Sequence, residues 1–219
     1  MPADVTGAWP WLSLAALGAF HGLNPAMGWL FAVGLGLQEG RRRAVYQALV
    51  PIAVGHALSI AAVVAAAGVA QLLVEPRVLR FAAAALLLGF GAYQLLARVR
   101  HRALAGMRVS RTDLAIWSFI TATGHGAGLM LVPPVLALAP VAPTHAGQRV
   151  SVVAGVTDAV GQGMAAVAVH TGAMLVVAGA VAVIVFDWVG VAFLRRAWVN
   201  FDILWAVALV LAGGVLLIV

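Results

Sequence analysis

Four histidines lie inside long apolar segments, where a polar side chain is costly to bury: His21, His56, His125 and His170. An ionisable residue at membrane depth marks a functional site by default. Neutral imidazole is the commonest metal ligand among side chains, and imidazole also carries protons near neutral pH. The four histidines therefore predict a metal-binding or proton-carrying site within a membrane.

Other polar residues accompany the histidines in these apolar segments, and we treat four of them as candidate substrate-binding residues: Asn24, Asp158, Gln162 and Gln47. Asn24 follows His21 by three residues, so the two share a face if the segment is helical. The Asp158 carboxylate would neutralise a cation or carry a proton, or it would lie at a helix end near the outer surface. Each of the four histidines also has a structural alternative, in which a backbone carbonyl or a serine satisfies its ring.

The segments that carry these residues predict a membrane protein. Hydrophobic residues make up 64% of the 219 residues and charged residues only 9%, and apolar runs of about 20 residues are long enough to cross a bilayer. The runs are continuous, whereas the strands of a membrane barrel alternate in polarity. The chain has no cysteine, which excludes disulfides, thiolate metal sites and iron–sulfur clusters.

We expect an all-α integral membrane protein with six transmembrane helices. The predicted spans are Trp11–Leu37, Val45–Leu73, Val78–Ala97, Leu114–Ala139, Val160–Phe186 and Phe201–Val219. The net charge of +6 comes from arginines in short connections, where they direct topology and do not indicate nucleic-acid binding.

The arginines divide unequally between the two sides of the predicted spans. Three lie on one side, Arg77, Arg80 and Arg149. Ten lie on the other: Arg41, Arg42, Arg43, Arg98, Arg100, Arg102, Arg108, Arg111, Arg195 and Arg196. The positive-inside rule places the ten in the cytoplasm of a bacterial cell, which predicts a multi-pass inner-membrane protein with both termini outside.

The two halves of the sequence resemble each other. The pairs His21 and His125, His56 and His170, and the helix starts at Arg80 and Asn200 occur in the same order, 104, 114 and 120 residues apart. This pattern predicts a duplication, with a first three-helix repeat over residues 1–97, a linker over 98–113 and a second repeat over 114–219. Because three spans is an odd number, the second copy must be inverted, as in many secondary transporters with a site at the bilayer midplane.

The first and fourth spans are each predicted to break. Pro25 removes a backbone donor and clashes with the carbonyl of His21. In the fourth span, glycines surround His125, and Pro133 and Pro134 follow. Broken helices in a membrane are tolerated where they line a cavity or are buried in protein.

The motif His21-Gly22-Leu23-Asn24-Pro25, six spans and a three-plus-three repeat together resemble the LysE-type exporter superfamily, and in motif its nickel/cobalt efflux branch. The resemblance implies an exporter of a small cation. That branch carries an acidic residue beside the proline and an aspartate–histidine pair after it, where this chain has Asn24 and Ala26-Met27. The chain also lacks the histidine-rich loop of some nickel exporters.

We therefore expect an inner-membrane secondary transporter of a divalent transition-metal ion (nickel, cobalt, zinc or copper) or another small cation. His21, His56, His125 and His170 would be its ligands. The alternative is an intramembrane metalloprotein or oxidoreductase with haem, copper or di-iron, and a scaffold subunit is a third possibility. The chain has no nucleotide-binding loop or hydrolase motif, so the sequence offers no evidence of ATP-driven transport or serine hydrolysis, and any transport would use a gradient or be passive. The lipid bilayer, a small cation and a second copy of the chain are the expected partners.

Overall fold

The computed structural model describes residues 5–97, 110–138, 152–189 and 201–218, and all regular structure in these ranges is helical. The elements are α1 Val5–Leu23, η1 Pro25–Met27, α2 Trp29–Glu39, α3 Arg42–Leu73, α4 Pro76–Ala97, α5 Arg111–His125, α6 Ala127–Met130, α7 Val132–Leu138, α8 Val152–Ile184, η2 Val185–Val189 and α10 Phe201–Ile218. The all-helical prediction is thus confirmed for the described residues. Most of the predicted linker, with Arg98, Arg100, Arg102 and Arg108, lies outside them, as do Arg149, Arg195 and Arg196.

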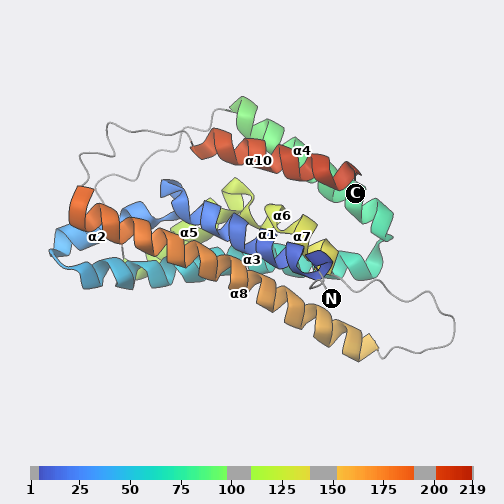
Figure 1. Cartoon of the computed structure of the whole chain (residues 1–219), viewed down its shortest axis with the longest axis horizontal. Helices are drawn as coiled ribbons and strands as arrows, with labels where there is room; N and C mark the ends of the chain where they lie inside the picture. The colour runs from blue at the N-terminus through green and yellow to red at the C-terminus, as the bar shows by residue number, and fades with distance from the viewer. Residues whose placement is uncertain (1–4, 98–109, 139–151, 190–200, 219) are drawn as a thin grey trace.

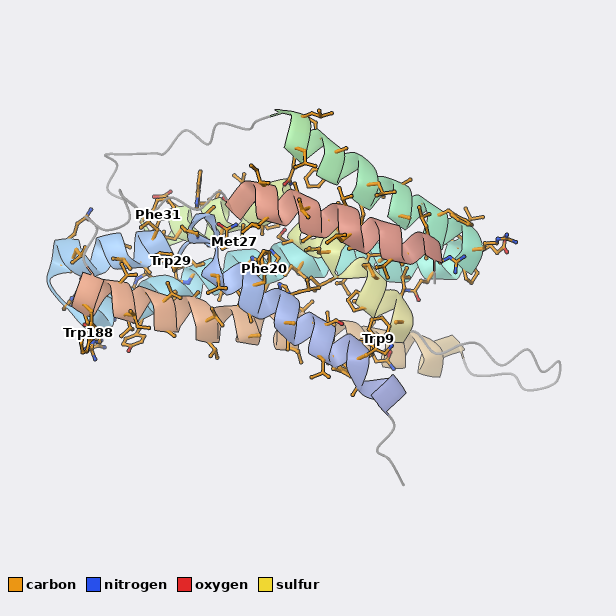
Figure 2. The ribbon with its side chains drawn as sticks, turned by 45° about the horizontal axis from the view of Figure 1, so that its top comes forward. Trp9, Phe20, Met27, Trp29, Phe31 and Trp188 are labelled. Atoms are coloured by element: carbon orange, nitrogen blue, oxygen red, sulfur yellow. The ribbon has the colours of Figure 1, made fainter. Side chains whose placement is uncertain are left out.

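Among the described residues, three helices are long and apolar enough to cross a membrane. They cover Arg42–Gln71 in α3, Pro76–Leu96 in α4 and Val160–Trp188 in α8 and η2. Trp9 and Trp188, both exposed, lie at opposite ends of the helical bundle (Figure 2). Tryptophan favours the two membrane–water interfaces. One exposed tryptophan at each end of the bundle therefore agrees with helices that run across a bilayer.

The first predicted break is present between α1 and α2. The helix ends at Leu23, and Asn24 has an extended backbone whose side-chain Oδ1 accepts a hydrogen bond from the Ala26 amide at 3.0 Å. Pro25 then starts a short 3₁₀ turn, at the first helical position, where its missing N–H costs no hydrogen bond. The Trp29 indole N–H donates to the Leu23 carbonyl at 3.2 Å, which satisfies one of the acceptors that the break exposes.

The second predicted break follows His125, the last residue of α5. Gly126 has a φ of 73°, a left-handed conformation that glycine adopts without steric cost, and its amide donates back into α5. The chain continues as α6 and α7. At the other end of α5, the Ser110 side chain and the Asp113 carboxylate form a capping box, and hydrogen bonds from Ser110 hold the pKa of Asp113 below its usual value.

The helices of the two halves pack in a crossed pattern. The most extensive contacts join α1 to α8, α3 to α5 and α4 to α10, and α3 also packs against α8. These contacts are symmetric between the two halves. The first helix of each half (α1 or α5) packs against the second helix of the other half (α8 or α3). The two second helices also pack against each other, as do the two third helices, α4 and α10. Figure 1 shows that α3 and α8 run in opposite directions, as do α4 and α10.

Glycines allow the closest helix approaches in this pattern. A Cβ at Gly18 of α1 would collide with the backbone oxygen of His170 on α8, and a Cβ at Gly55 of α3 would collide with that of Ala115 on α5. Small residues at such crossings let membrane helices approach until their backbones touch. The two crossed helix pairs therefore each depend on glycine.

Replacing Gly55 by alanine is expected to lower the melting temperature of the detergent-solubilised protein, because α3 and α5 must separate to admit the methyl group. Overpacking of this kind costs about 1–3 kcal/mol. Gly68→Ala is the matched control, since Gly68 lies on the same helix and no atom of the described residues comes within 4 Å of the added Cβ. Equal melting temperatures for the two variants would show that the α3–α5 approach is looser than described.

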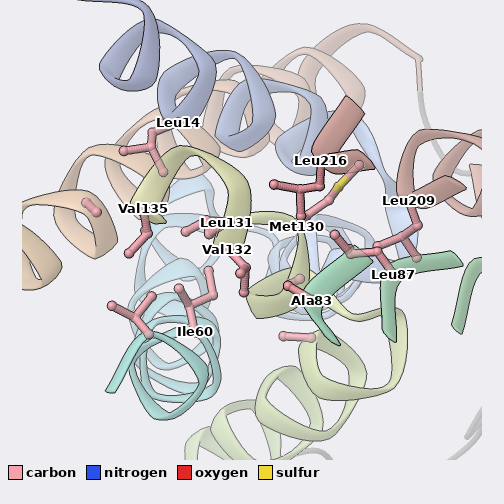
Figure 3. Close-up of a cluster of buried hydrophobic side chains, with 14 of the residues drawn as sticks. Leu14, Ile60, Ala83, Leu87, Met130, Leu131, Val132, Val135, Leu209 and Leu216 are labelled. Carbon is pink, nitrogen blue, oxygen red and sulfur yellow. The ribbon is translucent and has the colours of Figure 1, made fainter. Parts of the chain in front are cut away.

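Two buried apolar clusters support the bundle. One joins α2, the first half of α3 and the second half of α8 around Trp29, Ile52 and Ala182. The other lies where α6 and α7 reach between α1, α3, α4 and α10, and Figure 3 shows Met130 and Leu131 among side chains from those helices. Between these two clusters run the middle turns of α3 and α8, which carry His56 and His170.

Candidate metal centre

Three of the four predicted histidines come together in the interior. His21 on α1, His56 on α3 and His170 on α8 are each fully buried, and one ring nitrogen from each lies within 4.8 Å of the other two. The His21 ring centroid is 5.1 Å from that of His56 and 4.9 Å from that of His170, edge to face in both cases. The His56 and His170 rings are nearly parallel, with centroids 5.6 Å apart. We call these three residues the histidine cluster.

Backbone carbonyls of α1 orient two of these rings. His21 Nδ1 is 3.2 Å from the Leu17 carbonyl oxygen, and His170 Nδ1 is 3.2 Å from the Leu14 carbonyl oxygen. A carbonyl oxygen only accepts, so each Nδ1 carries the proton when it makes this bond, and each neutral ring then presents a lone pair on Nε2. Fixing the tautomer through the other ring nitrogen is how proteins prepare histidine as a metal ligand.

The other ring nitrogens of His56 and His170 make no hydrogen bond within the part of the chain that the structure describes. Both ring nitrogens of His56 and Nε2 of His170 lack a hydrogen-bond partner there, although all three atoms are buried. Buried polar atoms are normally paired, so an unpaired group in a native interior needs a physical explanation. A cation among the three rings would supply it.

The spacing of the histidine cluster fits a single metal ion. Nitrogen ligands stand about 2.0 Å from such an ion, so three of them in one plane lie about 3.5 Å apart. Nitrogens that already lie within 4.8 Å of one another reach that distance by small ring rotations. A haem fits less well, because its flat macrocycle must separate two axial imidazoles, and here a third ring lies about 5 Å from both.

His125, the fourth predicted ligand, is buried at the end of α5 but is not part of the histidine cluster. Its Nδ1 lies 2.8 Å from the Thr121 carbonyl oxygen, four residues back. His21 makes the same contact with Leu17, also four residues back. Both histidines stand two residues or fewer before a helix break. The prediction of four ligands in one group is therefore reduced to three.

Of the predicted substrate-binding residues, Asn24 is the one nearest to the histidine cluster along the chain. It is 3% exposed, and its side-chain Nδ2 has no hydrogen-bond partner among the described residues. The amide thus has a free donor beside His21, while its oxygen caps the 3₁₀ turn. Asn24 therefore holds the break in place and offers one further polar group near the cluster.

The structure does not bring the other three to the histidine cluster. Gln47 lies nine residues before His56 on α3, about 14 Å along the helix, and accepts a hydrogen bond from Arg111. Gln162 lies eight residues before His170 on α8, about 12 Å away. Asp158 is about 18 Å before His170 on the same helix, and its side chain lies outside the described residues.

Sequence reasoning missed one polar neighbour of the cluster. Thr171, beside His170, is buried with its hydroxyl unpaired within the described part of the chain. The Ser59 and Thr123 hydroxyls hydrogen-bond at 2.8 Å and so connect α3 to α5. The Leu14 and Leu17 carbonyls leave no signal in a sequence, because every residue has one.

No family model, curated protein or solved structure matches this chain. Its described part is helical, has three helices long enough to cross a membrane, and holds three buried imidazoles that could bind a metal ion.

Proposed function

We propose that this chain is a secondary transporter that carries a transition-metal ion across the bacterial inner membrane, with the histidine cluster as its binding site. The observation that carries the proposal is the convergence of His21, His56 and His170 from three helices into one buried group. Imidazole nitrogen suits zinc, copper, nickel and cobalt, which are borderline in softness. Ligands contributed by separate helices can also move apart when helices shift, which a carrier requires.

We further propose six spans arranged as a three-plus-three inverted repeat, as in the LysE-type exporters that the chain resembles. The crossed contacts of the two halves and the opposite directions of α3 and α8 support this arrangement. So do the two helix breaks, each directly after a histidine-bearing helix. A site shared between inverted repeats can open to either side when one repeat rocks against the other.

The described arginines support the orientation with both termini outside. Arg42 at the start of α3 forms a salt bridge with Asp187 in η2, just after α8. Arg111 at the start of α5 donates a hydrogen bond to the side-chain oxygen of Gln47. These groups share one end of the bundle with Arg41 and Arg43, whereas Arg77 and Arg80 lie at the start of α4, the opposite end of α3. The arginine-rich end would face the cytoplasm.

Metal flux into proteoliposomes tests the transport proposal. Liposomes that enclose a metal-sensitive dye and contain the wild-type protein should take up externally added ion, because the cluster offers a binding site partway across. His56→Ala is expected to reduce the flux to that of protein-free liposomes, because it removes one of three ligands. His145→Ala, which changes a histidine outside the apolar spans, should transport as wild type.

Two outcomes would contradict transport. Equal flux through wild type and His56→Ala would exclude the cluster as the route. Tight retention of copper that changes redox state, with no flux of zinc, nickel, cobalt or copper, would instead support the alternative of an intramembrane oxidoreductase.

A further inference from the structure

The charge around the histidine cluster constrains which ion it can hold. The described carboxylates Glu39, Glu75, Asp113 and Asp187 all lie at or beyond helix ends. Within the part of the chain that the structure describes, no carboxylate joins the three imidazoles. Three neutral rings bring no negative charge, so a bound ion keeps its full charge in a buried, apolar region.

An uncompensated charge in such a region favours an ion of low valence. The Born cost of burying an ion scales with the square of its charge, so a divalent ion costs about four times as much as a monovalent ion of equal size. In zinc enzymes with a two-histidine, one-glutamate site, the carboxylate offsets part of this charge. The histidine cluster has no such group among the described residues, which disfavours a divalent cargo.

One buried methionine, Met174, lies one helical turn beyond a cluster histidine. Met174 follows His170 by four residues on α8 and is fully buried, and long side chains of a helix lean back towards the residue four positions earlier. Gly22, next to His21, packs against the backbone of Met174, since a Cβ there would contact its oxygen. The backbone of Met174 therefore lies against Gly22, directly after His21, and one turn of α8 from His170. Thioether sulfur is a soft ligand that selects monovalent copper over zinc or nickel.

We infer that the cargo of this site is monovalent copper, bound by His21, His56 and His170 with Met174 as an additional thioether ligand. The inference rests on the proposed transport function and narrows it to a d¹⁰ monovalent ion. No electron transfer is involved, because the ion enters and leaves in the same oxidation state.

Competition titration measures this selectivity directly. Purified full-length protein in detergent, under anaerobic conditions with ascorbate, is titrated with copper(I) against a coloured copper(I) chelator, and separately with zinc(II) and nickel(II). We expect one copper(I) per chain, bound far more tightly than either divalent ion. Silver(I), also a d¹⁰ monovalent ion, should displace the copper.

Met174→Leu provides the residue-level test, because leucine keeps the buried volume and removes only the sulfur. Loss of even an outer contact to a metal-binding residue weakens affinity about 10- to 100-fold, and we expect copper(I) affinity to fall at least that far while weak zinc binding is unchanged. Met130→Leu is the matched control, since Met130 is equally buried but lies in the cluster shown in Figure 3. A normal elution profile for both variants establishes that they fold.

The outcomes separate this inference from the proposed function. Tight binding of zinc or nickel with weak copper(I) binding would overturn the inference and leave metal transport standing. Copper(I) binding that Met174→Leu does not weaken would exclude the thioether as a ligand. No binding of any of these ions would overturn both.

Discussion

Purified protein that carries His56→Ala is expected to retain no metal, whereas His125→Ala retains as much as wild type. His56 is one of three members of the histidine cluster, and removing a direct ligand should weaken binding by more than about a hundredfold. His125 is outside the cluster, so its loss leaves three ligands intact. Elemental analysis and an absorption spectrum of the same unboiled samples measure metal and haem together.

Three results of the comparison between His56→Ala and His125→Ala would contradict this expectation. If His125→Ala loses its metal as fully as His56→Ala, the ion is bound by four histidines and the described geometry is one state of a site that closes further. If His56→Ala keeps its metal, the cluster is not the binding site. If wild type shows a haem absorption band that both variants lose, the result would favour the alternative function of an intramembrane oxidoreductase. His56→Gln keeps a polar side chain but removes the imidazole. If this variant also loses the metal, the loss in His56→Ala does not come from misfolding.

Gly126→Ala is expected to lower stability by about 2–5 kcal/mol. An alanine at the φ of 73° pays about 1–2 kcal/mol for the left-handed backbone, and its Cβ would lie 2.7 Å from the Phe90 ring, which adds the cost of overpacking. Gly124→Ala is the control two residues earlier, where the described part of the chain has no atom within 4 Å of the added Cβ. Melting temperatures measured in one detergent at one scan rate give the comparison.

A double variant separates the two causes. Gly126→Ala with Phe90→Leu should recover the part of the loss that comes from the collision with the ring, and should keep the part that comes from the backbone conformation. Full recovery would mean that the left-handed conformation at Gly126 is unstrained for alanine. Equal melting temperatures for Gly126→Ala and Gly124→Ala would mean that the break after His125 has a different backbone from the one described.

Local features of the fold could be predicted from the sequence because they follow from single residues. Pro25 has no backbone N–H to donate, and a break was predicted and found there, whereas Pro10 and Pro51 lie inside α1 and α3. The bounds of α3, α4 and α10 lie within three residues of the predicted spans, because uninterrupted apolar runs have few alternatives in a membrane. The positions of the six spans in a bilayer stay a prediction.

The composition of the site was less predictable, because it depends on how helices cross. His56 and His170 each lie near the middle of a long helix, and no periodicity shows which neighbour each faces. The approach of α1 to α8 at Gly18 brings the Leu14 carbonyl to His170 and so places His170 beside His21. His125 matches His21 in sequence and in local geometry, yet the end of α5 leaves it outside the cluster. Equivalent sequence positions need not be equivalent ligands.

The crossed pairing of α1 with α8 and of α5 with α3 has a consequence for biosynthesis. When the ribosome has released only the first half of the chain, α1 lacks α8, the helix against which it packs most extensively. The side of α1 that carries His21 is then not yet covered by α8. Neither half can reach its final packing until α8 has been inserted, and no metal can be captured by three ligands before then. Two separately expressed halves should therefore remain protease-sensitive alone and become protected when produced together in the same membrane.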